Sequence, residues 1–528
     1  MTLCWKNKQA KREGRGGAGA HKRSLGVVCW QVQWRCPGRR AAGNLSNGKQ
    51  PGMVGRIHRI PSPRDRAAAR GGAGRQFLTS AAALGLLCAV LPSGIARGAE
   101  APNIVFVLFD DFGYGQPPCY REESVFKTPN MDRLAREGMR FTDAHSAASN
   151  CTPTRYGVLT GRYPCRIGQF RVLKTYSPPI IPRQRMTVAS FLKKQGYHTA
   201  CIGKWHLGMN WVDGKPGTED QLPIGAQLTD GPNAVGFDYF YGFTHARNIG
   251  SVIEQQHVVA HVEPVENQPL MIHKAIDYIE QRSAKTEPFF LYFPMCPPHN
   301  PIAPAATFAG KSGVNGKEGR YGDWIYQGDH MLGQILAALD RTGQAGRTLV
   351  IATGDNGAAK RPYAPLREAK SSIYEGGHRE PFVARWPGDI EPGSVSQQTI
   401  CLNDLFATCA EILGQAVPAN AAEDSVSFLS VLRGQQDGPV REATVHQAPG
   451  GLAIRQGPWK LVFHRSGERE LFNLQLDVGE TANCFADQPQ VVKNMTARMQ
   501  EYIDRGRSTP GPAQDNDFQI SLFGDKKK

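Results

Sequence analysis

Short apolar runs alternate with stretches of helical periodicity over most of the chain beyond residue 100. The segment Asn103–Phe109 is apolar after its first residue, which is typical of a strand buried on both faces. Similar strands are expected at His198–Ile202, Pro288–Phe293 and Thr348–Thr353, and helices at about Thr128–Arg136, Thr187–Gln195, Met271–Arg282 and Tyr326–Arg341. This alternation predicts an α/β fold, in which a large and mostly parallel sheet lies between helices on both faces.

The first predicted helix carries recognisable start and stop signals. Thr128 is a favourable N-cap residue, and Pro129 suits the first helical turn because that position needs no hydrogen-bond donor. Gly138 then marks the end of the helix. We therefore expect the Thr128 side chain to cap this helix.

The pattern changes after about Gly438. Short strands are expected at Leu452–Gln456, Trp459–Phe463 and Glu470–Asn473, followed by a helix over about Gln490–Arg505. This arrangement predicts a small antiparallel sheet with one helix. The chain of 528 residues is long enough for one large core and a second, smaller domain. We place the large domain at residues 100–438 and the small one at residues 439–528.

The net charge of +15 would suit a nucleic-acid-binding protein, but it is unevenly distributed. Residues 1–75 contain 17 Lys and Arg against two acids, whereas residues 76–528 contain 45 basic and 45 acidic residues. The body of the protein is therefore neutral, and we expect no nucleic-acid partner. Because residues 1–75 are rich in Gly, Arg and Ala and have no apolar period, we expect a disordered basic extension there.

An apolar run, Phe77–Leu91, follows the basic extension and precedes small residues around Ala96 and Gly98. This order predicts an export signal at residues 76–99 and a periplasmic or secreted protein. Since a bilayer span needs about 20 apolar residues, we expect no stable membrane span. A signal anchor and a buried helix are the alternative interpretations. Met53 is an alternative to Met1 as the start of the protein.

Eight of the 12 cysteines follow the predicted signal, and none of the eight forms a CxxC pair. A structural zinc site is therefore not expected. Export permits disulfide bonds, but their pairing is not readable from one sequence.

Two pairs of oxygen-bearing side chains directly follow predicted strands. Asp110 and Asp111 follow the first strand, and Asp355 and Asn356 follow the strand Thr348–Thr353. If both strands belong to one sheet, their carboxyl ends bring four oxygen ligands to one cation, and such a set favours calcium or magnesium over zinc. Solvated or helix-capping acids are the simpler explanation of either pair alone.

The segment from Cys151 to Arg155 reads C-T-P-T-R, and Leu159-Thr-Gly-Arg162 follows it. This sequence resembles the C-x-P-x-R motif of type I sulfatases, which belong to the alkaline phosphatase superfamily. If Cys151–Arg155 is considered alone, a buried cysteine near the start of a helix is the alternative interpretation. The resemblance covers nearly the whole chain beyond Pro102, in motifs at Asp110–Gly115, Gly203–Gly208, Pro298–Pro301, Gly354–Gly357, Lys370–Gly377, Arg455–Leu461 and Leu471–Leu474.

The resemblance implies that the chain hydrolyses sulfate monoesters of carbohydrates or aryl alcohols. It implies that a maturation enzyme oxidises Cys151 to formylglycine, whose hydrate attacks sulfur to give a covalent sulfo-enzyme intermediate. A single calcium ion would be held by Asp110, Asp111, residue 151, Asp355 and Asn356.

The resemblance also implies roles for further side chains. Lys204 and Lys370 would bind sulfate oxygens, and Arg155 would hold the hydrate. His299 would bind substrate and protonate the leaving oxygen, while His206 would remove a proton when sulfate departs.

Some positions remain open. Thr244, His245 and Arg247 all compete for one further sulfate contact, and Glu368-Ala369 replaces a glycine that is common before the second lysine. Arg171 and Lys174 suit a carbohydrate subsite or an ordinary charged surface. The alternative functions are a formylglycine phosphodiesterase or phosphonate-ester hydrolase, and a non-catalytic binder of sulfated glycans in which Cys151 stays a thiol.

Overall fold

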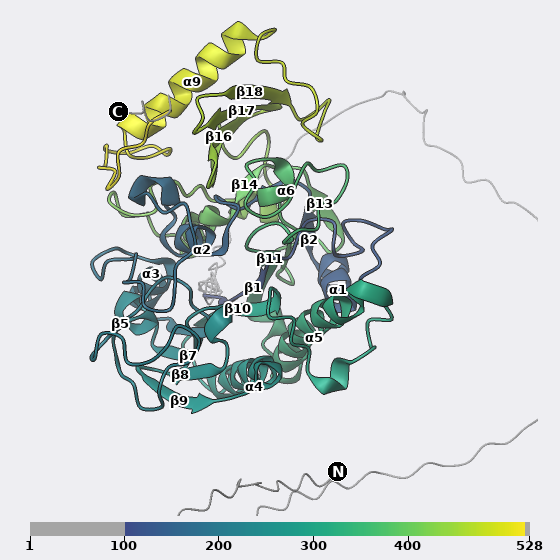
Figure 1. Cartoon of the computed structure of the whole chain (residues 1–528), viewed down its shortest axis with the longest axis vertical. Helices are drawn as coiled ribbons and strands as arrows, with labels where there is room; N and C mark the ends of the chain where they lie inside the picture. The colour runs from purple at the N-terminus through teal and green to yellow at the C-terminus, as the bar shows by residue number, and fades with distance from the viewer. Residues whose placement is uncertain (1–100, 523–528) are drawn as a thin grey trace, which may run out of the picture. The chain divides into compact units, whose positions relative to one another are not determined.

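The computed structural model describes residues 101–522 (Figure 1). The basic extension predicted at residues 1–75 and the export signal predicted at residues 76–99 lie outside the described residues. Between residues 101 and 522, no helix combines the length and the apolar character that crossing a membrane requires. All eight cysteines of this part are free thiols.

A ten-stranded sheet runs through the larger part of the structure, in the order β13-β2-β12-β11-β1-β10-β4-β7-β8-β9. Its five central strands, from β11 to β7, are parallel, while β12 and β8 join this block in antiparallel fashion. The predicted α/β fold with a mostly parallel centre is confirmed. The central strands are β1 (Asn103–Asp110), β4 (His198–Lys204), β7 (Tyr239–Phe243), β10 (Phe289–Pro298) and β11 (Thr348–Gly354). The outer strands are β2 (Met139–Phe141), β8 (Ser251–Glu254), β9 (His257–His261), β12 (Phe382–Arg385) and β13 (Ser394–Ser396).

Helices cover both faces of this sheet, as the alternation along β1 requires. Ile104, Phe106 and Leu108 point into one core, and Val105 and Val107 point into the other. Because every residue of β1 is buried, the strand is apolar on both faces. The first core contains α2 (Cys151–Thr160), α3 (Val188–Lys194), α7 (Leu405–Ile412) and α8 (Leu429–Leu432), and the second contains α1 (Pro129–Glu137), α4 (Pro264–Ser283) and α5 (Gly319–Arg341).

A second, antiparallel sheet follows, as predicted, and α9 crosses one of its faces (Figure 1). It has four strands where three were expected, because β15 was not predicted. Met495, Met499 and Tyr502 of the helix pack on that face, and Phe472 on the other face contacts Tyr374. The division into domains at residue 438 stays a prediction. The elements are β15 (Thr444–Ala448), β16 (Gly451–Gln456), β17 (Trp459–His464), β18 (Arg469–Asn473) and α9 (Pro489–Asp504).

Short elements complete the described part of the chain. Two small ladders pair β14 with β3 and β5 with β6. The segment α6 is a single turn shortly before β12. These elements are β3 (Ala144–His145), β5 (Asn210–Trp211), β6 (Leu228–Asp230), β14 (Ile400–Cys401) and α6 (Glu375–His378).

The cap predicted for α1 is wrong, although the helix begins where expected. The Thr128 hydroxyl is buried and has no hydrogen-bond partner. Instead, the Asp329 carboxylate of α5 accepts hydrogen bonds from the backbone N–H groups of Asn130 and Met131, at 2.8–3.1 Å. A long-range contact therefore satisfies the donors that the local residue was expected to satisfy.

The register of the central strands brings three strand ends to one edge. Phe109 of β1 pairs with Gly354 of β11, and Asp110 pairs with Pro298 of β10. The residues that directly follow β1, β10 and β11 are therefore neighbours. This edge carries the candidate active site.

Candidate active site

Cys151 is the first residue of α2 and is completely buried. Its thiol donates a hydrogen bond to Asp110 Oδ1 (3.1 Å), and Lys370 Nζ donates one to Sγ (3.3 Å). Burial raises the pKa of this thiol well above its usual value, and the charges of Asp110 and Asp355 raise it further. A neutral thiol at this position is a weak nucleophile.

The helix α2 ends at Gly161, whose backbone lies in the left-handed region (φ 65°). A Cβ at Gly161 would lie 2.8 Å from the Ala422 Cβ, so both the conformation and the space demand glycine. The glycine thus ends the helix that positions Cys151 and Arg155.

Arg155 lies one turn beyond Cys151 and is also completely buried. Its guanidinium donates hydrogen bonds to Asp355 Oδ2 (2.7 Å) and to the Lys204 carbonyl (3.2 Å), and lies 3.5 Å from Asp110 Oδ1. Burial opposes the charge of this arginine, but the two carboxylates outweigh it and raise the pKa. Arg155 therefore links the ends of three strands.

The two predicted pairs of cation ligands meet. The backbone N–H of Asp111 donates to Asp355 Oδ1 (3.0 Å), and Asn356 Nδ2 donates to Asp111 Oδ1 (2.8 Å). Asp111 adopts a left-handed conformation (φ 64°), which aspartate tolerates better than most residues. Burial would raise the pKa of Asp110, but the positive charges of His299, Lys204 and Arg155 hold it well below its usual value.

The donor set of this cluster fits a divalent cation. Asn356 Oδ1 is buried and has no hydrogen-bond partner, so its lone pairs are free for a metal. Ligand atoms of four side chains lie within 4.8 Å of one another, namely those of Asp110, Asp111, Cys151 and His299. Carboxylate and amide oxygens are typical ligands of calcium and magnesium.

Asp355 lies beside this group with both carboxylate oxygens engaged by Asp111 and Arg155. Burial raises the pKa of Asp355 to about 7, and the neighbouring Asp110 charge contributes to this rise. Three carboxylates crowd together at this edge of the sheet. A bound cation would relieve their mutual repulsion.

Two lysines face the carboxylates from different elements. Lys204 ends β4, and its buried Nζ lies 2.5 Å from Asp110 Oδ2. Lys370 belongs to the loop before α6 and forms an ion pair with Asp111. Burial works against both charges, yet Asp110 and Asp111 raise the pKa of these lysines, so both stay protonated. Together they offer positive charge to an anion beside residue 151.

The two predicted catalytic histidines occupy different environments. His299 follows β10, its side chain is 24% exposed, and its Nε2 lies 3.7 Å from Asp111 Oδ2. His206 is buried in the loop after β4, where Nε2 contacts the Leu173 carbonyl (3.1 Å) and Nδ1 has no hydrogen-bond partner. Burial lowers the pKa of both rings. His299 thus faces an opening, whereas His206 is enclosed.

The competing residues near the end of β7 also differ in environment. The Thr244 hydroxyl is buried without a partner. His245 Nδ1 accepts from the Arg247 backbone N–H (3.2 Å), so Nε2 carries the proton and donates it to Thr175 Oγ1 (2.8 Å). Arg247 is exposed and pairs with Asp220 (3.0 Å).

The other suggested subsite residues also have definite positions. Arg171 is exposed, and Lys174 borders a small cavity of about 10 Å³ that His206 shares.

A cleft of about 620 Å³ opens beside His299. Its walls come from four segments, at residues 220–221, 246–251, 261–264 and 299–301. The sequence alone did not indicate Asp220, His261 or Glu263 as site residues, because they belong to no motif and lie far apart in the chain.

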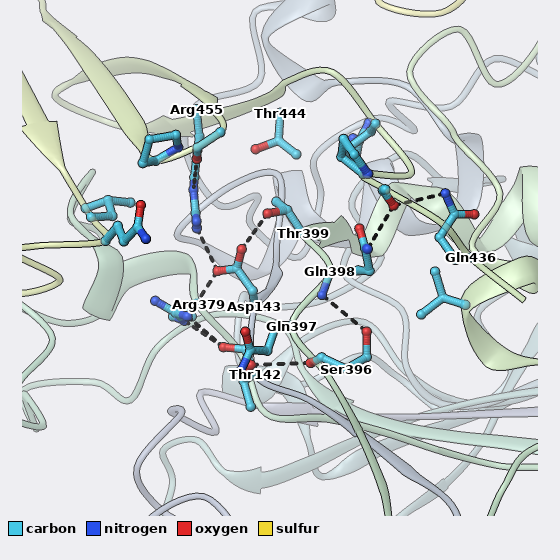
Figure 2. Close-up of a pocket in the computed structure, with 18 of the residues that line it drawn as sticks. Thr142, Asp143, Arg379, Ser396, Gln397, Gln398, Thr399, Gln436, Thr444 and Arg455 are labelled. Atoms are coloured by element: carbon cyan, nitrogen blue, oxygen red, sulfur yellow. Dashed lines mark hydrogen bonds and ion pairs between the residues drawn. The ribbon is translucent and has the colours of Figure 1, made fainter. Parts of the chain in front are cut away.

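A larger cavity, of about 1110 Å³, contains none of the predicted site residues. It lies between the β13–β2 edge of the large sheet and the small sheet. Figure 2 shows Asp143 in its wall, held by Arg379 (3.0 Å), Arg455 (2.6 Å) and Thr399. The charged groups that line its wall are thus largely paired with one another.

Comparison with known proteins identifies related sequences. The model of the sulfatase family matches residues 102–415. The chain is 30% identical to N-acetylgalactosamine-6-O-sulfatase of Bacteroides thetaiotaomicron over 499 residues, which cover 78% of this chain and 94% of the relative. It is 32% identical to arylsulfatase A of Homo sapiens over 420 residues, which cover 72% and 78% of the two chains.

Comparison with solved structures also finds similar proteins. A protein from a Bacteroides thetaiotaomicron study on the metabolism of multiple glycosaminoglycans superposes with a TM-score of 0.70 and 28% identity, covering 76% of this chain and 99% of its own. The phosphonate monoester hydrolase of Agrobacterium radiobacter, at 17% identity and a TM-score of 0.54, shares the fold alone. The fold is therefore that of the alkaline phosphatase superfamily, and the chain belongs to the sulfatase family of sulfuric ester hydrolases.

Proposed function

We propose that this enzyme hydrolyses sulfate monoesters of carbohydrates at residue 151, after Cys151 has been converted to formylglycine, beside a bound calcium ion. The observation that carries the proposal is the position of Cys151 Sγ, at hydrogen-bonding distance from both Asp110 and Lys370. An attacking group there would lie between a carboxylate cluster suited to a cation and a lysine suited to an anion. The carbohydrate class is supported by the relative named as an N-acetylgalactosamine-6-O-sulfatase.

The environment of Cys151 favours conversion over a role for the thiol itself. A thiol with a raised pKa stays neutral, and a thiolate would be repelled by Asp110 and by the negative charge of the sulfate ester. Formylglycine supplies a hydrated aldehyde, in which one hydroxyl can attack sulfur and the other can expel sulfate afterwards. A separate maturation enzyme would carry out the conversion.

Asp110, Asp111, Asp355 and Asn356 would hold the calcium ion together with residue 151. The unpartnered Asn356 Oδ1 and the crowded carboxylates support this assignment. The ion supplies positive charge next to the nucleophile and the sulfate.

The cationic side chains of this chain would bind and orient the substrate. Lys204, which pairs with Asp110, and Lys370, which pairs with Asp111, bind sulfate oxygens as point charges. Arg155, fixed by Asp355 and the Lys204 carbonyl, orients the oxygen of residue 151. These groups are ordered before the substrate arrives, which is the arrangement that electrostatic stabilisation requires.

The two histidines would move protons. His299 donates a proton to the leaving oxygen, because its ring lies between the carboxylates and the cleft. His206 accepts a proton on Nδ1 when sulfate departs, since Nε2 already donates to the Leu173 carbonyl. We also propose that the enzyme is exported, on the strength of the apolar run Phe77–Leu91.

Sulfate release from a panel of sulfated sugars tests this proposal. Cys151→Ala should lower turnover by at least about 1000-fold because no other group replaces the nucleophile. Cys409→Ala is the matched control, since Cys409 is equally buried but lies in α7, and it should retain activity. More than a few per cent of wild-type turnover in Cys151→Ala would refute the assignment. Faster hydrolysis of phosphodiesters or phosphonate esters, or binding of sulfated glycans without turnover, would favour the alternatives.

A further inference from the structure

The cleft beside His299 is a candidate site for the alcohol part of a sulfate ester. In the proposed function, which this inference deepens, His299 protonates the leaving oxygen. The cleft includes His299 in its wall, and its volume of about 620 Å³ is in the usual range for small-molecule sites, about 300–1000 Å³. The alcohol part of the ester therefore occupies this cleft.

One part of the cleft wall is apolar. Ile249, Val262 and Pro301 contribute carbon surface to it, and Ala246 and Pro264 extend that surface. A sugar ring presents C–H groups on its faces and hydroxyls around its edge. Such a ring packs on an apolar wall only if polar partners are available at its edge.

An exposed ion pair, Asp220 with Arg247, supplies these polar partners. Asp220 Oδ1 accepts a hydrogen bond from Arg247 Nε (3.2 Å) and lies 3.0 Å from one terminal guanidinium nitrogen in an ion pair. The side chains are 67% and 64% exposed, so their remaining donors and acceptors face solvent. A carboxylate beside a guanidinium can accept from one sugar hydroxyl and donate to the next.

The charges of the wall disfavour a second anionic group on the sugar. Asp220 and Glu263 carry two negative charges, and Arg247 carries one positive charge. The His261 ring contacts neighbours on both sides: Nδ1 lies 3.2 Å from the Gln221 side-chain amide, and Nε2 contacts the Leu222 carbonyl. A uronate or a second sulfate would thus face two carboxylates and one arginine that is already paired.

We infer that the Asp220–Arg247 pair determines specificity, binding hydroxyl groups of an uncharged sugar ring that carries the sulfate and rejecting rings with a second anionic group. The pair acts on the sugar and not on the sulfate, which the lysines near residue 151 bind. Its contribution is therefore absent for substrates without a sugar.

Three substrates and four variants test this inference in the mature enzyme. The substrates are 4-nitrophenyl sulfate, the neutral sugar monosulfate that the wild type hydrolyses fastest, and the disulfate that adds one sulfate to the same sugar. In Arg247→Ala and Asp220→Ala, kcat/KM for the monosulfate should fall by about 10- to 100-fold, the size expected for hydrogen bonds to charged groups. The fall for 4-nitrophenyl sulfate should stay below about 3-fold. Arg183→Ala, which breaks an exposed pair with Asp230 outside the cleft, should change neither value.

The disulfate distinguishes hydroxyl recognition from a general effect of the cleft. Wild type should prefer the monosulfate, and Asp220→Asn should reduce that preference because it removes one negative charge from the wall. Equal losses on the aryl and sugar substrates in Arg247→Ala would overturn the inference, as would a wild-type preference for the disulfate. No sulfate release by wild type from any of the three would instead overturn the proposed function.

Discussion

At the residue scale, the side chains around Cys151 divide into those that would hold sulfate and one that would assist the leaving group. Lys204 and Lys370 are paired with the buried carboxylates, whereas His299 borders the cleft. The two kinds of residue should therefore respond differently to the choice of substrate. Sugar alcohols are poor leaving groups, and nitrophenolate is a good one.

His299→Ala should slow sugar sulfates far more than 4-nitrophenyl sulfate. A sugar alkoxide needs a proton as the S–O bond breaks, and general-acid assistance is typically worth about 10²–10⁴-fold. Lys204→Ala is the comparison variant, which should impair both substrates because the sulfate group is common to them. Steady-state kcat on the two substrates decides the question. Equal losses in His299→Ala would mean that His299 only binds sulfate and that another residue is the acid.

Asn356→Ala should weaken calcium binding by at least about 10-fold, because it removes the proposed ligand atom Asn356 Oδ1, which is buried and has no hydrogen-bond partner. Isothermal titration with calcium measures this directly, without reference to activity. Asn403→Ala is the control, since Asn403 is a buried asparagine that also lacks hydrogen-bond partners but lies outside the cluster. Unchanged calcium affinity in Asn356→Ala would remove Asn356 from the ligand set.

Sequence motifs anticipated which residues gather around Cys151, and several of these motifs directly follow a buried strand. Asp110 and Asp355 are an example, since two apolar runs and the parallel-sheet rule were enough to bring them together. Asp220 and Arg247 were not paired in advance. Both lie in loops, and the contact between them depends on the path of the intervening chain, for which the sequence has no periodic signal.

At the element scale, helix α1 shows how a tertiary contact replaces a local one. Asp329 accepts two backbone hydrogen bonds at the helix start and one from Asn130 Nδ2 (2.8 Å). The Thr128 hydroxyl, which local rules favour as the cap, has no partner. The helix start is therefore fixed by α5.

Asp329→Ala should lower the free energy of unfolding by at least about 2 kcal/mol, because it leaves buried N–H groups unsatisfied. Thr128→Ala should cost no more than about 1 kcal/mol, the value for one buried methyl group. Urea unfolding of both variants gives the comparison. The reverse order of the two losses would show that Thr128, and not Asp329, fixes the helix start.

The end of β10 could not be predicted from the local sequence either. The strand was expected to stop at Phe293, yet it continues to Pro298 and so brings His299 to the edge of the sheet. Pro294, Pro297 and Pro298 argue against a central strand, because proline cannot donate to the ladder. The pairing with β1 accordingly becomes irregular between Leu108 and Asp110, where the prolines lie opposite. These prolines made the end of the strand hard to predict. They also lie directly before the loop that carries His299.

At the scale of the whole molecule, a buried polar network joins the two sheets. Lys460 of β17 lies 3.1 Å from Glu375, 2.7 Å from Glu480 and 3.0 Å from His378 Nε2. The rings of His378 and His446 stack at 4.1 Å between their centroids. Because the network includes α6, which begins five residues after Lys370, it also supports the loop that carries this lysine.

This network makes stability depend on pH in a predictable direction. Burial lowers the pKa of His446 well below its usual value, so below about pH 6.5 the unfolded chain takes up a proton that the folded protein refuses. The contribution of neutral His446 to the free energy of unfolding is therefore present above pH 6.5 and is lost as the pH falls below it. Between pH 8 and pH 5.5, wild type should lose about 1 kcal/mol more unfolding free energy than His446→Gln.

Urea unfolding at the two pH values measures this difference. His257→Gln, which changes an exposed histidine on β9, is the control and should match wild type. If His446→Gln shows the same pH dependence as wild type, His446 does not contribute to it.

The large sheet and the small sheet were both predictable, because buried strands and helices differ in their hydrophobic period. The contact between the sheets was not, since it is made by charged and histidine side chains that carry no periodic pattern. His145, His378 and His446 are far apart in the sequence, yet each has a ring nitrogen within 4.8 Å of the others.

The mass of residue 151 tests the central claim most directly. In protein that releases sulfate, the peptide containing this residue should be lighter by about 18 Da than the cysteine-containing sequence predicts, because formylglycine replaces cysteine. The fraction converted should rise and fall with the rate of sulfate release across preparations. An unmodified cysteine in fully active protein would contradict formylglycine catalysis at residue 151.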